Sequence, residues 1–316
     1  MNKKDLRIVF MGTPGFAVES LKALVENEYN VVGVITAPDR PAGRGDKLQP
    51  SAVKEYALTQ GLNILQPEKL RDEGFLNELR ALKADIQVVV AFRMLPEVVW
   101  DMPPKGTFNL HASLLPQYRG AAPINWAIIN GEKETGVTTF FLKHEIDTGE
   151  IIFQTSIKID DNDNVEVVHD KLMNIGANLV VKTIDAVIED NVMPKPQSDF
   201  FSCESELKPA PKIFKDTCQI DWTKGVEEIH NFVRGLSPYP AAWTDLKVKD
   251  ENLSFKIFET KPIKESHDKQ PGEIVTDNKA TLRIAAQDGF IDVLDLQLSG
   301  KRRMKTDQFL NGFSFE

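Results

Sequence analysis

The first 190 residues alternate short apolar runs with helical patterns, and this alternation limits the possible folds more than any other feature. Helical periodicity separates runs with strand character, and residues 151–159 add an extended ribbon. The strand-like runs are residues 6–11, 31–36, 86–91, 107–110 and 137–142, and the helical patterns are residues 17–26, 51–60, 123–130 and 164–189. Strands that alternate with helices form parallel sheets with crossover helices. We therefore predict an α/β domain over residues 1–190.

The composition changes after residue 190. Prolines within residues 193–198 and 208–212 interrupt any regular element, which predicts an extended linker over residues 191–211. Beyond it, residues 226–236 have helical periodicity, and the other apolar runs are short and separated by Gly, Asp, Asn and Lys turns. Short strands at such spacing indicate a small barrel or sandwich over residues 212–316.

Charge and apolar content limit the environment and the partners. No apolar run approaches the roughly 20 residues that span a bilayer, and the start lacks signal-peptide character, so we expect a cytoplasmic protein without membrane contact. The net charge of −9 argues against a polyanionic partner, but residues 207–316 contain 17 basic and 17 acidic side chains. A neutral C-terminal segment with a local basic cluster can still bind phosphates.

Three sequence features most often have a purely structural role. Cys203 and Cys218 have neither the number nor the spacing for a disulfide framework or a zinc site. The segment from Gly12 to Gly15 follows a strand and precedes a helix, where backbone N–H groups can bind an anion. Because Pro14 removes one of these donors, a tight turn is the more frequent explanation.

A basic loop is predicted from residue 39 to residue 47. Its Gly and Pro content indicates an adaptable backbone, and it contains Arg40, Arg44 and Lys47. A short basic loop is by itself most often only solvated.

A possible reaction centre follows the predicted strand at residues 107–110. Asn109 and His111 project from the same face of that strand, near the end where open α/β sheets bind ligands. An Asn amide can donate to a developing oxyanion, and a His can exchange protons near neutral pH. Asp147 lies in a turn after a later strand and can bring a carboxylate to the imidazole.

Each of these residues also has a simpler explanation. The Asn-x-His pair can be two hydrogen-bonded edge residues, and Asp147-Thr-Gly149 can be an Asx turn. An aspartic-protease site is disfavoured because a second Asp-Thr-Gly motif is absent, and one carboxylate cannot form the dyad.

The combination of motifs resembles the formyltransferases that use 10-formyltetrahydrofolate. The motifs are Asn109-x-His111, Ser113-Leu-Leu-Pro116, Arg119-Gly-Ala-Ala-Pro123, Thr135-Gly-Val-Thr138 and Asp147-Thr-Gly149. Three further segments resemble the members that act on methionyl-tRNA: residues 39–44, 238–243 and 307–310. The resemblance covers almost the whole chain.

This resemblance implies a Rossmann-like catalytic domain followed by a C-terminal OB-like β-barrel that helps to hold RNA. It implies 10-formyltetrahydrofolate as formyl donor, methionyl initiator tRNA as acceptor and no metal; we expect a monomer. The implied catalytic residues are Asn109, His111 and Asp147. The implied folate-binding residues are Ser113, Leu114, Leu115, Pro116, Phe92 and Arg93, and the implied tRNA-binding residues are Arg40, Arg44, Lys47, Lys301, Arg302, Arg303 and Lys305.

Two segments depart from the family pattern. Residues 91–96 lack the usual Tyr-Gly pair and are one residue shorter, which leaves the role of Arg93 open between the glutamate tail of folate and solvent. Asp46 makes the basic loop less basic than related loops.

Two other functions compete with this interpretation. The same Asn, His and Asp centre serves formyltransferases that act on a purine-pathway ribonucleotide or an amino sugar, but those have no need of an RNA-binding barrel. A non-catalytic RNA-binding protein on the same scaffold is disfavoured by the intact centre.

Overall fold

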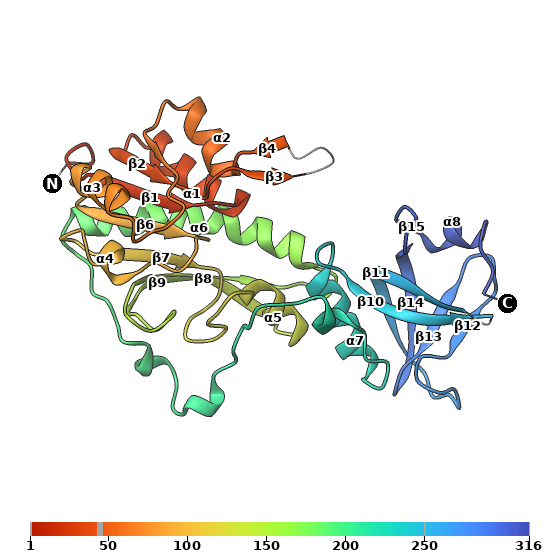
Figure 1. Cartoon of the computed structure of the whole chain (residues 1–316). Helices are drawn as coiled ribbons and strands as arrows, with labels where there is room; N and C mark the ends of the chain where they lie inside the picture. The colour runs from red at the N-terminus through yellow and green to blue at the C-terminus, as the bar shows by residue number, and fades with distance from the viewer. Residues whose placement is uncertain (1, 43–46, 250, 316) are drawn as a thin grey trace. The chain divides into compact units, whose positions relative to one another are not determined.

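The computed structural model describes residues 2–42, 47–249 and 251–315, which form two compact units (Figure 1). Unit 1 comprises Met1–Gly120, Gly136–Ile157 and His169–Lys208, and unit 2 comprises Ala121–Thr135, Lys158–Val168 and Pro209–Glu316. Two short segments from the middle of the chain therefore belong to the unit that contains the C-terminal residues.

Unit 1 is built on a seven-stranded sheet in the order β5-β2-β1-β6-β7-β8-β9. The pairs among the first five strands are parallel, and β8 runs antiparallel to β7. The strands are β1 (Ile8–Gly12), β2 (Val31–Ile35), β5 (Ile64–Leu65), β6 (Ile86–Val90), β7 (Thr107–His111), β8 (Glu134–Phe141) and β9 (Ile151–Lys158). The predicted α/β fold is confirmed.

Helices cover the two faces of this sheet. They are α1 (Gly15–Glu26), α2 (Ala52–Thr59), α3 (Glu73–Ala81), α4 (Glu97–Trp100) and the long α6 (Val165–Ile188). Apolar side chains of α3 and α4 pack with Val9, Met11 and Val89 on one face, and Gly176 of α6 approaches Leu110 on the other. In the part of the chain that the structure describes, none of the helices is long and apolar enough to cross a membrane.

Helices α3 and α4, strand β5 and a hairpin of unit 1 were not predicted. Helix α3 follows its N-cap residue Asp72, whose carboxylate accepts from the Phe75 backbone N–H. Asp72 and the apolar residues at positions 75, 76 and 79 are the sequence pattern that indicates this helix. The expected loop at residues 39–47 contains a short antiparallel hairpin instead, formed by β3 (Arg40–Ala42) and β4 (Lys47–Gln49). Pairing of the loop ends satisfies backbone groups that a free loop would leave to water.

Unit 2 contains an antiparallel sheet in the order β10-β11-β14-β13-β12, with β15 beside β14. Its strands are β10 (Ala242–Val248), β11 (Glu251–Lys264), β12 (Ile274–Thr276), β13 (Leu282–Ala285), β14 (Gly289–Leu298) and β15 (Met304–Lys305), and its helices are α5 (Pro123–Ile129), α7 (Val226–Leu236) and α8 (Thr306–Leu310). Apolar residues of α7 and α8 close the core, where Phe255 contacts Phe309, Phe313 and Phe315. The predicted OB-like β-barrel class is confirmed.

Helix α7 is tied to residues 160–163, which come from far earlier in the chain. His230 Nε2 donates to the Asp161 carbonyl oxygen at 3.3 Å, and the Thr260 hydroxyl lies 3.0 Å from His230 Nδ1. Arg234 donates to the carbonyl oxygens of Asp160 and Asp163. Burial lowers the pKa of His230.

This burial predicts a pH-dependent stability. Since the folded pKa of His230 lies below its unfolded value, the unfolded chain binds more protons in acid, and the free energy of unfolding falls as the pH drops below about 6.5. A His230→Gln variant has no imidazole to protonate, so its unfolding free energy should vary less between pH 7.5 and pH 5.5. Urea unfolding at a series of pH values measures this difference, and parallel curves for both proteins would contradict it.

Candidate active site

Asn109 and His111 project from β7 on the same face of the sheet. Asn109 pairs with Phe140 and His111 with Thr138 across the antiparallel β7–β8 ladder. The half-buried Asn109 amide forms no hydrogen bond with another residue that the structure describes. A half-buried amide without a partner on this face is free to donate to a ligand.

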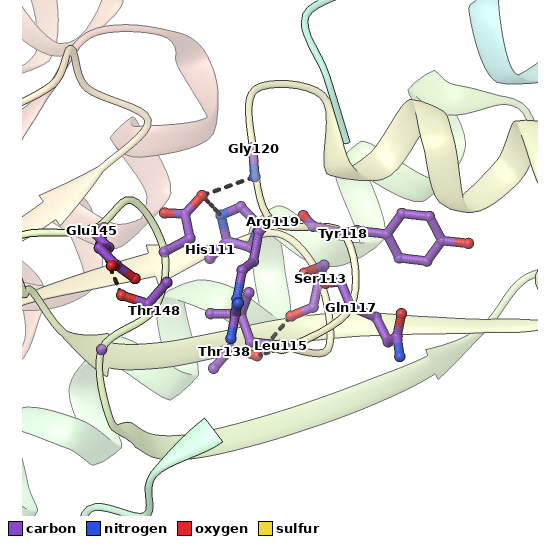
Figure 2. Close-up of polar contacts among 12 residues, drawn as sticks. His111, Ser113, Leu115, Gln117, Tyr118, Arg119, Gly120, Thr138, Glu145 and Thr148 are labelled. Carbon is purple, nitrogen blue, oxygen red and sulfur yellow. Dashed lines mark hydrogen bonds and ion pairs between the residues drawn. The ribbon is translucent and has the colours of Figure 1, made fainter. Parts of the chain in front are cut away.

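His111 lies between two partners (Figure 2). Its Nε2 lies 2.9 Å from the Tyr118 carbonyl oxygen, which can only accept, so the Nε2 proton is directed there. Its Nδ1 lies 3.9 Å from the Asp147 carboxylate, and the two side chains are 8% and 11% exposed. A proton that His111 gains therefore goes to Nδ1, beside Asp147. The structure thus places the Asp147 carboxylate beside the imidazole.

The loop that carries Asp147 folds back over β8. Asp147 has a left-handed backbone with φ of 55°, and its carboxylate accepts from the Gly120 N–H at 2.9 Å. At Gly149 a Cβ atom would lie 1.6 Å from the Phe141 carbonyl oxygen, so only glycine fits. Figure 2 shows the hydrogen bond on this loop from the Thr148 hydroxyl to the Glu145 carbonyl oxygen. Gln197 was not among the predicted site residues, yet its amide donates to the carbonyl oxygens of Asp147 and Gly149.

The segment of residues 113–116 is a packed turn. Ser113, Leu115 and Pro116 are buried, and Leu115 packs with Phe140 and Ile151. The Ser113 hydroxyl donates to the Gln117 carbonyl oxygen at 2.6 Å. Within this segment, side-chain contact with a ligand is therefore open mainly to the half-buried Leu114.

Phe92 and Arg93 follow the end of β6. Phe92 packs against the core beneath α3 and α4. The Arg93 guanidinium lies over the Phe92 ring and donates to the carbonyl oxygens of Pro67 and Glu68. Arg93 therefore fixes a neighbouring turn, a contact that neither of the two expected roles included.

The basic hairpin is anchored at its base. Asp39 accepts from Lys54 at 2.6 Å and from Gln66 at 2.8 Å, and both contacts lower the pKa of Asp39. The Arg40 side chain is exposed. Arg44 and Asp46 lie outside the described residues, and Lys47 is described only as the first residue of β4.

The cations of residues 301–305 divide into two groups. Arg303 pairs with Asp295 at 2.9 Å and lies over Phe258, and Lys305 contacts Glu259 and Asp295. Lys301 and Arg302 are exposed and form no ion pair within the described part of the chain. Only these two offer unpaired charge from the expected cluster.

A groove of about 960 Å³ in unit 2 combines cations with aromatic side chains. It is lined by Lys212, Lys215, Lys256, Phe214, Tyr239 and Trp243, among others. Tyr239 is 81% exposed and Phe214 is 58% exposed, which is unusual for large apolar side chains. This groove was not predicted, although the lysines at positions 208, 212 and 215 mark a basic segment in the sequence.

Comparison with known proteins shows the family. The formyl transferase model matches residues 6–184, and the model of the formyl transferase C-terminal domain matches residues 212–314. The chain belongs to the formyl transferase family. It is a formyl-transferring enzyme of the class that uses formyl-tetrahydrofolate, so the resemblance found in the sequence is confirmed. Among the described residues, no cluster of three or more His, Cys, Asp or Glu side chains could hold a metal ion.

Close relatives cover the full chain. The methionyl-tRNA formyltransferase of Bacteroides fragilis is 63% identical over 314 residues, which are 99% of this chain and 97% of the relative. That of Flavobacterium johnsoniae is 55% identical, with 99% and 98% covered.

Solved structures share the fold at lower identity. An N-formyltransferase of Helicobacter canadensis, in complex with folinic acid and dTDP-3-aminofucose, has a TM-score of 0.67 at 22% identity, with 91% of this chain and 98% of that chain covered. HypX of Aquifex aeolicus with tetrahydrofolic acid has a TM-score of 0.64 at 17% identity, with 96% and 47% covered.

The close approach at Gly149 predicts that Gly149→Ala displaces the Asp147 loop, because the added methyl group meets backbone and not a movable side chain. We expect a lower melting temperature and a large loss of formyl transfer. Gly312→Ala is the matched control, since a Cβ there meets nothing within 4 Å. Thermal unfolding and turnover measure the two effects, and equal values for both variants would contradict the prediction.

Proposed function

We propose that this enzyme transfers the formyl group of 10-formyltetrahydrofolate to the α-amino group of methionyl initiator tRNA, in the cytoplasm. The observation that carries the proposal is the identity of 63% over nearly the whole length of a methionyl-tRNA formyltransferase. The contact between His111 and Asp147, beside a free Asn109 amide, supports it.

Asn109 is proposed as the donor that stabilises negative charge on the formyl oxygen during transfer. The bound donor supplies the reactive formyl carbon, and the residues of the chain must stabilise charge and move protons. A preorganised amide loses little energy to reorganisation, so it is an effective electrostatic catalyst. None of the residues that the structure describes bonds to this amide, which keeps its N–H groups available to a ligand.

His111 is proposed as the proton relay, and Asp147 as the group that holds it. The attacking amine must lose a proton, and the leaving nitrogen of the donor must gain one. Nδ1 of His111 is the available position, because Nε2 is directed to Tyr118. The Asp147 carboxylate stabilises the imidazolium that forms when Nδ1 takes a proton.

The folate contacts and the domain roles are part of the proposal. Residues 1–190 form the catalytic domain, residues 191–211 connect it, and residues 212–316 bind tRNA. Residues 113–116 form a wall of the folate site through their backbone and Leu114, since the other side chains are buried. Phe92 supplies an apolar edge, and Arg93 holds the adjoining turn at Pro67 and Glu68.

The RNA is proposed to contact the basic hairpin with Arg40, Arg44 and Lys47, and the two unpaired cations Lys301 and Arg302. Arg303 and Lys305 are proposed to hold the segment that carries Lys301 and Arg302, through their ion pairs with Asp295 and Glu259. The groove of unit 2 adds lysines beside exposed aromatic rings, a combination that binds single-stranded nucleic acid through phosphate contacts and base stacking. The chain is proposed to act as a monomer.

The decisive test is incubation with 10-formyltetrahydrofolate and methionyl-tRNA, in which initiator is compared with elongator. We expect formylation of the initiator form. Transfer to neither tRNA would overturn the proposal. If an amino sugar or a ribonucleotide, supplied in place of the tRNA, is formylated instead, that compound is the acceptor.

The role of Asn109 predicts that Asn109→Ala lowers kcat by about 10² to 10³. A labelled formyl donor under saturating substrates measures turnover, and circular dichroism verifies folding. Asn27→Ala is the control, since Asn27 also donates through its amide but to the Ala23 carbonyl oxygen on α1. Near-normal turnover of Asn109→Ala would remove this residue from the mechanism.

Because Lys301 and Arg302 are unpaired whereas Arg303 is paired, we expect their substitutions to affect RNA binding differently. Lys301→Ala combined with Arg302→Ala should weaken the binding of methionyl-tRNA and reduce the slope of log affinity against log salt by about 2. Arg303→Ala should lower the melting temperature and leave that slope nearly unchanged, because its charge is paired with Asp295. Affinity titrations at several salt concentrations measure both, and an RNA affinity independent of salt would exclude the phosphate contacts.

A further inference from the structure

Gln197 lies at the centre of the polar contacts around the Asp147 loop. It begins the short 3₁₀ helix Gln197–Phe200 and is only 3% exposed. Its Nε2 donates to the Asp147 carbonyl oxygen at 2.7 Å and to the Gly149 carbonyl oxygen at 2.8 Å. Its Oε1 accepts from Nε and Nη2 of Arg119, at 2.9 and 2.6 Å. Both amide protons and both lone pairs of the carbonyl oxygen are thus used.

These four bonds join the backbone of the Asp147 loop to the side chain of Arg119. Gly120, which donates to that carboxylate, directly follows Arg119 in the chain. Gln197 therefore fixes the backbone of Asp147 on one side and the neighbour of its hydrogen-bond donor on the other. The left-handed backbone of Asp147 is an unusual conformation, which persists only where neighbouring contacts maintain it.

A backbone bridge to the edge strand β9 lies two residues before Gln197. Lys195 pairs with Ile151 in an antiparallel bridge, with both backbone bonds at 2.8 Å. This bridge holds the backbone two residues before Gln197 against Ile151, the first residue of β9, and Gly149 lies two residues before Ile151. The segment predicted as a linker is thus bonded to the edge strand of the sheet beside the Asp147 loop.

The far end of the same segment holds the other partner of His111. The Tyr118 N–H donates to the Lys208 carbonyl oxygen at 2.6 Å, and the Lys208 N–H donates to Gln117 Oε1 at 2.8 Å. Tyr118 in turn provides the carbonyl that accepts from His111 Nε2. Residues 195–208 therefore contact both turns between which His111 lies.

We propose that Gln197 is a positioning residue for formyl transfer, which acts by holding Asp147 beside His111. This inference rests on the proposed function. A primary amide suits the position because Arg119 can only donate and the two carbonyl groups can only accept. A carboxylate keeps the acceptor for Arg119 but places an oxygen against two carbonyl oxygens, and an apolar side chain loses all four bonds.

The test compares Gln197→Met and Gln197→Glu with the wild-type enzyme in transfer from 10-formyltetrahydrofolate to methionyl-tRNA. We expect kcat to fall by about 10- to 100-fold in both, as is typical when a group that orients an active-site residue is removed, with little change in KM. Tyr29→Phe is the control; it loses one side-chain hydrogen bond in unit 1, to Asp185 at 2.6 Å, and should keep wild-type kcat. Wild-type kcat in either Gln197 variant would overturn the proposal.

A double-mutant comparison separates positioning from general stabilisation. Because Gln197 is proposed to act through Asp147, adding Gln197→Met to Asp147→Asn should lower kcat by less than about threefold in single-turnover experiments. A full additional loss would show that Gln197 acts elsewhere and would overturn the proposal. Should the Gln197 variants fail to fold, Arg119→Met tests the same link from its other end, and unchanged kcat there would count against it. A wild-type enzyme without transfer activity would instead reject the proposed function.

Discussion

The return of residues 142–150 over the β7–β8 ladder is the constraint on which the active site depends. His111 projects from β7, and Asp147 reaches it only because Gly149 packs against the Phe141 carbonyl oxygen without a side chain. The strand pairing supplies Asn109 and His111 at fixed spacing, whereas the loop supplies the carboxylate. A rigid sheet and a restrained loop are therefore both required, since a shift of about 1 Å at a catalytic group can change rates by two orders of magnitude.

Sequence patterns predicted the parts of the site that depend on local spacing. Asn109 and His111 lie two residues apart on one strand, so their common face follows from the period of a β-strand. The contact of Asp147 with His111 was expected from the motif combination, but its supports were not, because Gln197 and Gly120 meet it only through tertiary packing. No local sequence pattern distinguishes a buried, hydrogen-bonded Gln in a Pro-rich segment from a Gln in a solvated linker.

The basic residues illustrate the same limit for electrostatics. Counting charges treats residues 301–305 as one cluster, yet Arg303 and Lys305 are paired with acidic side chains of strands β14 and β11. Arg93 likewise binds the backbone of residues 67 and 68. Side-chain charge is readable from sequence, whereas its availability to a partner is decided by the fold. Pairing reduces the field that a cation presents to a phosphate, so the unpaired cations carry most of the attraction.

The contacts of residues 195–208 explain how a segment with only two short 3₁₀ helices can support the proposed chemistry. Its backbone bonds to Ile151 and Tyr118 place it along unit 1, and its one buried amide fills a position that only complementary donors and acceptors satisfy. Burying such a group without its partners would cost about 1 to 3 kcal/mol, so the segment and the Asp147 loop stabilise each other's conformation. The proposed catalytic geometry therefore depends on a segment that follows the sheet in sequence and is bonded to its edge strand in space.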